Sequence, residues 1–214
     1  MRVLLADDHK MMRDGLRALL ERQPAMEIVG EASTGYEVLT QAERLQPDVV
    51  VMDVTMPELN GVEATRRLVA ARPGIKVVAL SVHTDRRYMM AMFEAGAMAY
   101  VPKNVAFEEL AQAIHAVMQG QRYLSPAVTG AVIEGYLRKS TPAAAPGTSL
   151  SPREREVLQL LAEGNSSKDI ASRLSLSVAT VETHRRQIAA KLDIHSVAEL
   201  TKYAIREGLT SLDD

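Results

Sequence analysis

Residues 47–57 read Pro-Asp-Val-Val-Val-Met-Asp-Val-Thr-Met-Pro, and this stretch decides the fold. Four consecutive apolar residues, Val49 to Met52, stand between the two prolines. Such a run predicts a short strand that is buried on both faces, as in a parallel sheet. Asp53 follows the run directly, which places a carboxylate at the carboxyl end of the strand. Open α/β sheets bind their ligands at that edge.

Strand-like and helix-like segments alternate on both sides of this run. Further apolar strands are predicted at residues 2–6, 26–29, 75–80 and 98–101. The segments with helical periodicity are residues 9–22, 36–45, 61–72, 86–95 and 106–118. Five strand–helix units of this length predict an α/β domain with a doubly wound, five-stranded parallel sheet over residues 1–122.

The remainder of the chain changes character. Residues 123–148 are predicted to form a linker helix, which Ser125-Pro126 starts and which runs to residue 137, and then a flexible linker rich in Pro, Ala and small polar residues. Residues 149–214 are predicted to be a small all-α domain. Its helix starts are the capping box Ser151 to Glu154 and the serines at 167, 177 and 196. A tight turn at residues 175–177 between two of these helices indicates a helix-turn-helix.

Composition excludes several function classes. The chain has 214 residues, a net charge of −2 and no cysteine. Disulfides, thiolate chemistry and cysteine-rich zinc sites are therefore excluded, and whole-chain charge favours neither nucleic acid nor membrane. No segment approaches the run of about 18 apolar residues that a membrane span needs, so we expect a cytoplasmic protein with no membrane partner.

Polar side chains follow four of the predicted strands: Asp7 and Asp8, Asp53, Ser81 and Lys103. Right-handed connections bring the carboxyl ends of parallel strands to one edge of the sheet. Carboxylates gathered there repel each other, and Mg²⁺ with its preference for oxygen ligands relieves that repulsion. A carboxylate beside Mg²⁺ can attack a phosphoryl group, whose oxygens the lysine would neutralise and the serine would hydrogen-bond. His9, His83 and His115 are interpreted as residues without a metal-binding or catalytic role.

With this residue set, residues 1–122 resemble the receiver domain of two-component response regulators, which has the CheY and flavodoxin-like fold. The resemblance implies that Asp53 accepts a phosphoryl group from a sensor histidine kinase. It also implies that Asp8, Asp53 and the backbone carbonyl of Thr55 bind Mg²⁺ directly, with Asp7 acting through water.

The same resemblance implies a switch. Lys103 would pair with the phosphoryl group, and Ser81 and Tyr100 match the switch positions of the family. On phosphorylation the Ser81 hydroxyl would move to a phosphoryl oxygen and the Tyr100 ring would turn inward.

Three segments in the last 66 residues, 150–158, 168–171 and 178–192, resemble the LuxR/NarL/FixJ DNA-binding domain. Acidic residues slightly outnumber basic ones from residue 149 onward, so DNA binding must come from where the charges lie. By position in the family's recognition helix, the base-edge readers are Glu182, Thr183 and Arg186. Arginine pairs naturally with guanine and glutamate with cytosine. The expected phosphate contacts are His184, Arg185, Lys191 and Lys168.

The sequence therefore predicts a response regulator and transcription factor that is not an enzyme. Phosphorylation of Asp53 by a sensor histidine kinase would promote homodimerisation and binding to double-stranded DNA, with RNA polymerase as a possible partner. The last helix is a candidate dimer face, and a two-fold dimer would read half-sites about 10 bp apart.

Three alternatives stay open at this point. A phosphatase of the haloacid dehalogenase type needs a second aspartate two residues after the nucleophile, where this chain has Thr55. The second alternative is a receiver that serves only for dimerisation, against which the full acidic set argues. The third is an output domain that binds RNA, which the turn and recognition-helix pattern disfavours.

Overall fold

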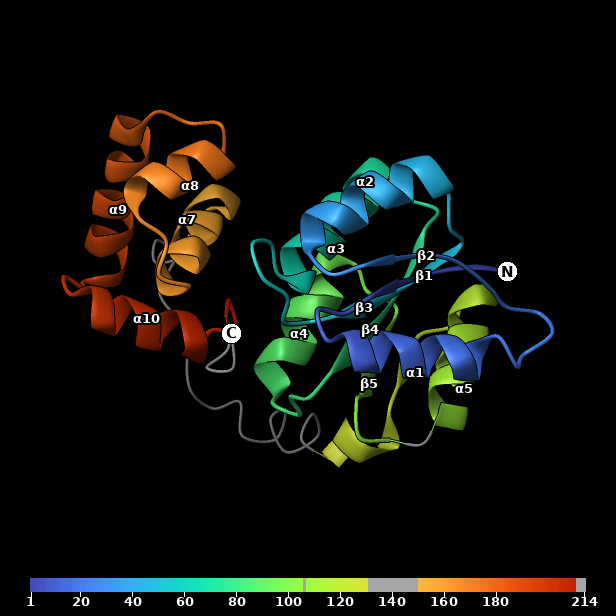
Figure 1. The fold of residues 1–214 in the computed structure, drawn as a ribbon. Coiled ribbons are helices and arrows are strands. Elements are labelled where there is room, and N and C mark those ends of the chain that lie inside the picture. Colours follow the sequence, from blue (N-terminus) through green and yellow to red (C-terminus); the bar gives the residue numbers. More distant parts are fainter. Residues whose placement is uncertain (106, 131–149, 211–214) are drawn as a thin grey trace. The chain divides into compact units, whose positions relative to one another are not determined.

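The computed structural model describes residues 1–105, 107–130 and 150–210 and divides into two compact units, Met1–Ser140 and Thr141–Asp214 (Figure 1). The predicted flexible linker and the end of the predicted linker helix lie outside the described residues. Helical structure does begin at Pro126 and continues through residue 130. In the described residues no helix is long and apolar enough to cross a membrane.

The first unit is built on a parallel sheet, as predicted. Its strands are β1 (Arg2–Ala6), β2 (Glu27–Ala32), β3 (Val49–Asp53), β4 (Lys76–Ser81), β5 (Ala99–Pro102) and β6 (Tyr123–Leu124). They lie in the order β2-β1-β3-β4-β5-β6, and every neighbouring pair is parallel.

The predicted number of five strands was too low by one. The Tyr123 amide donates to the Met98 carbonyl at 2.9 Å, and the Ser125 amide donates to the Tyr100 carbonyl at 3.1 Å, which adds β6 beside β5. A strand of two residues is too short to show any alternation of polar and apolar side chains, so the sequence pattern did not reveal it.

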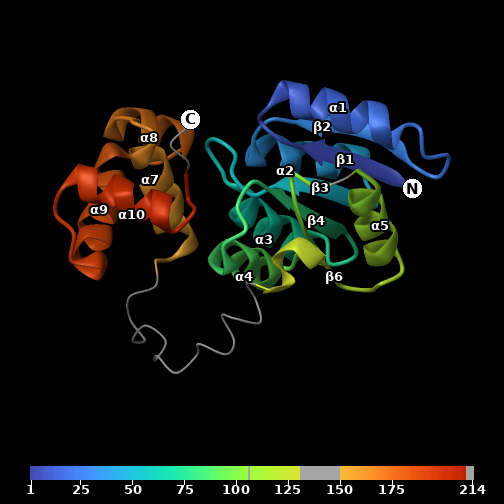
Figure 2. The same cartoon turned by 90° about the horizontal axis from the view of Figure 1, so that it is seen from below.

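The helices cover both faces of the sheet. Figure 1 shows α2 (Gly35–Leu45) and α3 (Gly61–Ala71) on one face and α1 (Lys10–Leu20) and α5 (Phe107–Met118) on the other. The fifth helix of this unit is α4 (Arg86–Ala95), which packs with α3 (Figure 2). Side chains of β3 alternate between the two cores: Val49 and Val51 pack toward α1 and α5, and Val50 and Met52 toward α2, α3 and α4. The apolar run is thus buried on both faces, as its composition predicted.

Local signals set the helix ends. The Asp85 side chain accepts a hydrogen bond from the Arg87 amide, and Gly96 ends α4 with a φ of 110°, so both predicted ends of this helix are confirmed.

The second strand, β2, is longer than predicted. Gly30 and Glu31 interrupt its apolar pattern but still pair with β1.

The second unit is helical in its described part, with α7 (Pro152–Ala162), α8 (Ser167–Arg173), α9 (Val178–Leu192) and α10 (Val197–Arg206). The capping box of Ser151 and Glu154 is confirmed. The predicted cap of α8 was wrong by one residue. Ser166 caps the helix, because Asp169 lies three residues after it and returns a hydrogen bond to its amide. Ser167 is the first helical residue instead.

The start of α3 packs closely against the backbone at the carboxyl end of β3. A Cβ atom added to Gly61 would lie 1.9 Å from the Asp53 carbonyl oxygen, whereas one added to Gly15 on α1 meets nothing within 4 Å. Gly61→Ala must therefore push α3 away from β3. We expect it to lower the free energy of unfolding by more than about 2 kcal/mol, measured by urea denaturation.

Gly15→Ala is the matched control. It adds the same methyl group to an exposed helix interior, so it should raise stability by about 0.5–1 kcal/mol. Equal stability of the Gly61→Ala variant and the wild type would contradict the close approach.

Candidate functional site

The carboxyl ends of four strands place the predicted polar residues together. Asp53 is the last residue of β3 and Ser81 the last of β4, and Asp7 and Lys103 directly follow β1 and β5. The strands end level, because Ala6 pairs with Met52 and Ser81 pairs with Pro102. Potential ligand atoms of Asp7, Asp8, His9 and Asp53 all lie within 4.8 Å of one another.

A buried ammonium holds two of these carboxylates. The Lys103 Nζ lies 2.7 Å from Asp53 Oδ2 and 2.7 Å from Asp7 Oδ2, and the side chains of the three residues are 7%, 1% and 1% exposed. Burial opposes the charge on the lysine, but the two carboxylates outweigh it and hold the pKa of Lys103 above its ordinary value.

In this group the negative charge of the Asp53 carboxylate is unfavourable. Burial raises the pKa of Asp53 to about 7, and the neighbouring charges of Asp7 and Asp8 add to that effect while Lys103 opposes it. The ionised carboxylate is therefore costly to keep in this pocket without further positive charge. The donor set of carboxylate oxygens fits a hard divalent cation such as Mg²⁺.

The loops after β1 and β3 shape the pocket. The His9 amide donates to Asp7 Oδ1 at 2.9 Å, and the Thr55 amide donates to Asp53 Oδ1 at 3.3 Å. His9 is the N-cap residue of α1 and its side chain is 65% exposed, but its Nδ1 lies 2.7 Å from Asp8 Oδ1. Apart from the adjacency of the two residues, no sequence pattern predicts this contact.

Ser81 and Tyr100 are joined through His83, to which the sequence assigned no functional role. The Ser81 Oγ accepts from the His83 amide at 3.0 Å, and the Tyr100 hydroxyl donates to the His83 carbonyl at 2.8 Å. The His83 ring also stacks on Tyr88, with centroids 4.1 Å apart. Two of these three contacts use the backbone, so residue type alone could not have indicated them.

The Tyr100 ring lies inward in this structure, with an exposure of 0%. Burial raises the pKa of Tyr100 to about 12. The phenol therefore stays protonated at physiological pH and remains a hydrogen-bond donor to the loop after β4.

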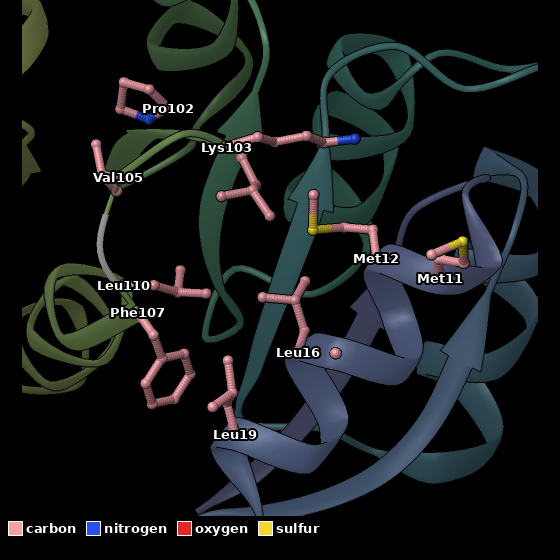
Figure 3. Close-up of a pocket in the computed structure, with 11 residues that line it drawn as sticks. Met11, Met12, Leu16, Leu19, Pro102, Lys103, Val105, Phe107 and Leu110 are labelled. Atoms are coloured by element: carbon pink, nitrogen blue, oxygen red, sulfur yellow. The ribbon is translucent and has the colours of Figure 1, made fainter.

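An apolar groove borders the polar site. Figure 3 shows Met12, Leu16 and Leu19 of α1 facing Phe107 and Leu110 across a pocket of about 370 Å³. The stem of Lys103 lines one end of this pocket, while its ammonium pairs with the carboxylates. Met11 at the rim is 89% exposed.

In the second unit, α9 separates a buried from an outward face. Val181 and Ile188 are fully buried, and Leu192 is half-buried. Thr183 and Arg186 lie together on the exposed face, where an Arg186 terminal nitrogen donates to Thr183 Oγ1 at 3.3 Å.

Glu182 is engaged within the unit. Its Oε1 accepts from the Ser167 hydroxyl at 2.5 Å and from Arg185 at 3.0 Å, and Arg185 also donates to the Ser167 oxygen at 2.9 Å. The Ser167 hydrogen bond lowers the pKa of Glu182. Ser167 was expected only as a helix cap, so its part in this cluster was missed.

The predicted phosphate contacts differ in their surroundings. Lys168 is exposed on α8, and His184 is half-buried. Lys191 instead forms an ion pair of 2.7 Å with Glu154 of the α7 capping box. Burial alone would raise the pKa of Glu154, but Lys191 and Ser151 outweigh it and hold that pKa below its usual value. Lys191 therefore has a structural partner.

Comparisons with known proteins agree with both units. The family model described as response regulator receiver domain matches residues 3–115, and the one described as bacterial regulatory proteins, luxR family, matches residues 148–204. The transcriptional regulatory protein LiaR of Bacillus subtilis is 40% identical over 210 residues, which cover 98% of this chain and 99% of LiaR. The response regulator UvrY of Escherichia coli is 35% identical over 211 residues, 99% of this chain and 96% of UvrY.

The chain is also similar to solved structures of response regulators. RcsB from Salmonella enterica serovar Typhimurium, bound to promoter rprA in the presence of the phosphomimetic BeF₃⁻, is 25% identical, with a TM-score of 0.62. The likeness covers 95% of this chain and 98% of that one.

The raised pKa of Asp53 makes a prediction about stability and pH. An unfolded Asp53 loses its proton near pH 4, whereas the folded one holds it to about pH 7, so its contribution to stability falls as pH rises through that window. Asp53→Asn removes this penalty. In metal-free buffer at pH 8 we expect the variant to be more stable than the wild type by more than about 1 kcal/mol, a difference that shrinks toward pH 4.

Thermal and urea unfolding across this pH range measure the difference. Asp14→Asn on the exposed side of α1 is the control and should change stability by less than about 0.5 kcal/mol. Greater stability of the wild type at pH 8 would refute the cost of holding the ionised Asp53 carboxylate in this buried site.

The Lys191–Glu154 pair makes a second prediction. Lys191→Ala leaves the Glu154 carboxylate without its ammonium, so we expect a loss of about 1–3 kcal/mol in the free energy of unfolding at pH 7. Lys168→Ala removes an exposed ammonium and should cost less than about 0.5 kcal/mol. Equal, small losses in urea denaturation would show that the ion pair contributes little.

Proposed function

The chain belongs to the response regulators that join a receiver domain to a LuxR-type DNA-binding domain, and from this membership we propose that Asp53 is its phosphoacceptor and α9 its DNA-reading helix. Its relatives are transcriptional regulators of two-component systems. We assign the receiver to residues 1–122, the linker to 123–148 and the DNA-binding domain to 149–214.

The observation that carries the proposal is the Lys103 ammonium 2.7 Å from both Asp53 and Asp7. In the proposed reaction an Asp53 oxygen attacks the phosphorus of a phosphohistidine on a sensor kinase. The bond from phosphorus to the histidine nitrogen breaks, and an acyl phosphate forms on Asp53. Lys103 then exchanges its carboxylate partner for an oxygen of the new phosphoryl group.

The acidic residues would hold Mg²⁺ for this step. Asp8, Asp53 and the Thr55 backbone carbonyl would bind it directly, with Asp7 acting through water. Bound Mg²⁺ supplies positive charge that offsets the repulsion among the carboxylates and neutralises phosphoryl oxygens. Because Asp53 must lose its proton for both roles, we expect Mg²⁺ affinity to rise as pH increases through about 7.

The switch would use Ser81, Tyr100 and the loop between them. The Ser81 oxygen accepts from the His83 amide, and its hydroxyl pairs with Tyr100, so the hydroxyl would turn from Tyr100 to donate to a phosphoryl oxygen. Tyr100 holds the His83 carbonyl. A shift of this loop would therefore connect the phosphoryl group to the Tyr100 ring and to α4.

Residue 55 argues against a hydrolase. A phosphatase of the haloacid dehalogenase type needs a general acid at that position, and the threonine there donates its backbone amide to Asp53 instead. We propose that the phosphoryl group on Asp53 is a signal rather than an intermediate of turnover.

The output step would be DNA binding by a homodimer in the cytoplasm, where it could contact RNA polymerase. The solved structure of RcsB with promoter DNA and a phosphomimetic supports this assignment by similarity. Glu182, Thr183 and Arg186 would read base edges, Glu182 only if its hydrogen bonds to Ser167 and Arg185 open. His184, Arg185, Lys168 and Lys191 would contact phosphates, Lys191 only if its pair with Glu154 opens.

The acceptor is tested with acetyl phosphate and Mg²⁺. The intact wild-type protein should gain the mass of one phosphoryl group, and Asp53→Asn should gain none. Asp48→Asn, which changes a carboxylate at the opposite end of β3, should be labelled like the wild type. Labelling of the Asp53→Asn protein at the wild-type rate would exclude Asp53 as the acceptor.

The reading helix is tested with DNA selected from a random pool. Arg186→Ala should weaken binding to the selected site by about 1–3 kcal/mol and affect random DNA much less. Glu182→Gln removes a negative charge near the phosphates and should strengthen binding to random DNA. If Arg186→Ala weakened binding to the selected site and to random DNA equally, Arg186 would be a phosphate contact and not a base reader.

A further inference from the structure

Two arginines of α1 share one carboxylate of β2. The Arg13 Nε lies 3.1 Å from Glu31 Oε2, and the Arg17 Nε lies 2.6 Å from Glu31 Oε1. The side chains of Arg13 and Glu31 are 14% and 26% exposed. Both arginines thus reach from α1 to β2, and neither lines the apolar groove of Figure 3.

Only one of the two arginines also reaches the acidic site. A terminal nitrogen of Arg13 donates to the Asp7 backbone carbonyl at 2.5 Å. The second hydrogen bond of Arg17 runs to Glu21, at 3.1 Å, one turn further along the helix. The two arginines share Glu31, but only Arg13 is also hydrogen-bonded to the backbone beside the acidic site.

The Asp7 carbonyl belongs to the peptide group that joins Asp7 to Asp8. The Asp7 amide donates to the Ala32 carbonyl at 3.1 Å, and the chain then leaves the β1–β2 ladder. Beyond that point the guanidinium takes the place of a ladder partner, and a charge-assisted hydrogen bond of this kind fixes the peptide plane firmly. Rotation of this plane would move the Asp7 and Asp8 carboxylates relative to each other.

We propose that Arg13, anchored by Glu31, is a positioning residue that holds the Asp7–Asp8 peptide so that both carboxylates face the cation site. The inference rests on the proposed Mg²⁺ site. Positioning and simple charge repulsion predict opposite changes in Mg²⁺ affinity. Arg13 is a cation near the acidic cluster, so charge repulsion alone predicts that its removal strengthens Mg²⁺ binding. Positioning predicts the opposite.

The test measures Mg²⁺ affinity of the full-length chain by isothermal titration calorimetry at pH 8. Arg13→Gln should weaken Mg²⁺ binding about 10-fold, the size of effect that groups orienting metal ligands have. Arg17→Gln removes the neighbouring cation from the same carboxylate and should keep the affinity within about twofold. Arg13→Lys, which keeps the charge without the fork of donors, should lie between wild type and Arg13→Gln.

Amide hydrogen exchange of the metal-free protein is the second readout. Arg13→Gln should speed exchange at His9, whose amide donates to Asp7, and Arg17→Gln should not. Unchanged or stronger Mg²⁺ binding in Arg13→Gln would overturn the inference, as would an equal loss in Arg17→Gln. If the wild type bound no Mg²⁺, the proposed metal site would fail, and unchanged exchange in Arg13→Gln would then overturn the positioning role separately.

Discussion

The ammonium of Lys103 between the carboxylates of Asp53 and Asp7 is the interaction on which the rest of the receiver depends. The three side chains are nearly inaccessible to water, so their charges must satisfy one another. Burial raises the pKa of Asp53 to about 7, and the single ammonium of Lys103 does not offset burial together with the charges of Asp7 and Asp8. This imbalance makes the site receptive to a divalent cation, and a charged ligand that binds there changes the energies of every group that touches it.

The fold supplies this arrangement through its strands and loops. Parallel strands that end level bring residues from distant parts of the chain to one edge, and the loops beyond them are tied back by backbone hydrogen bonds. Helix α1 serves two purposes at that edge, since one side lines an apolar groove and the other holds the loop of Asp7 through Arg13. The loop after β4 connects Ser81 with Tyr100 through His83.

The sequence predicted the features that depend on local pattern. The apolar run of β3, the polar residues at the strand ends and the capping box at Ser151 all have signatures within a few neighbouring residues. What it did not predict depends on distant partners. Arg13 and Glu31 are 18 residues apart, and Lys191 and Glu154 are 37 apart, so only the strand register and helix packing bring them together. The cap of α8 was misplaced because two adjacent serines are equally good caps, and the position of Asp169 decides between them.

We propose that a phosphoryl group at Asp53 controls DNA binding by the second unit. The most direct test is the affinity of the full-length chain for selected DNA, measured by fluorescence anisotropy at constant salt with Mg²⁺, with and without beryllofluoride. We predict that beryllofluoride strengthens binding by the wild type about 10-fold or more and has no effect on Asp53→Asn. Equal affinities with and without beryllofluoride in the wild type would show that the site at Asp53 does not control DNA binding.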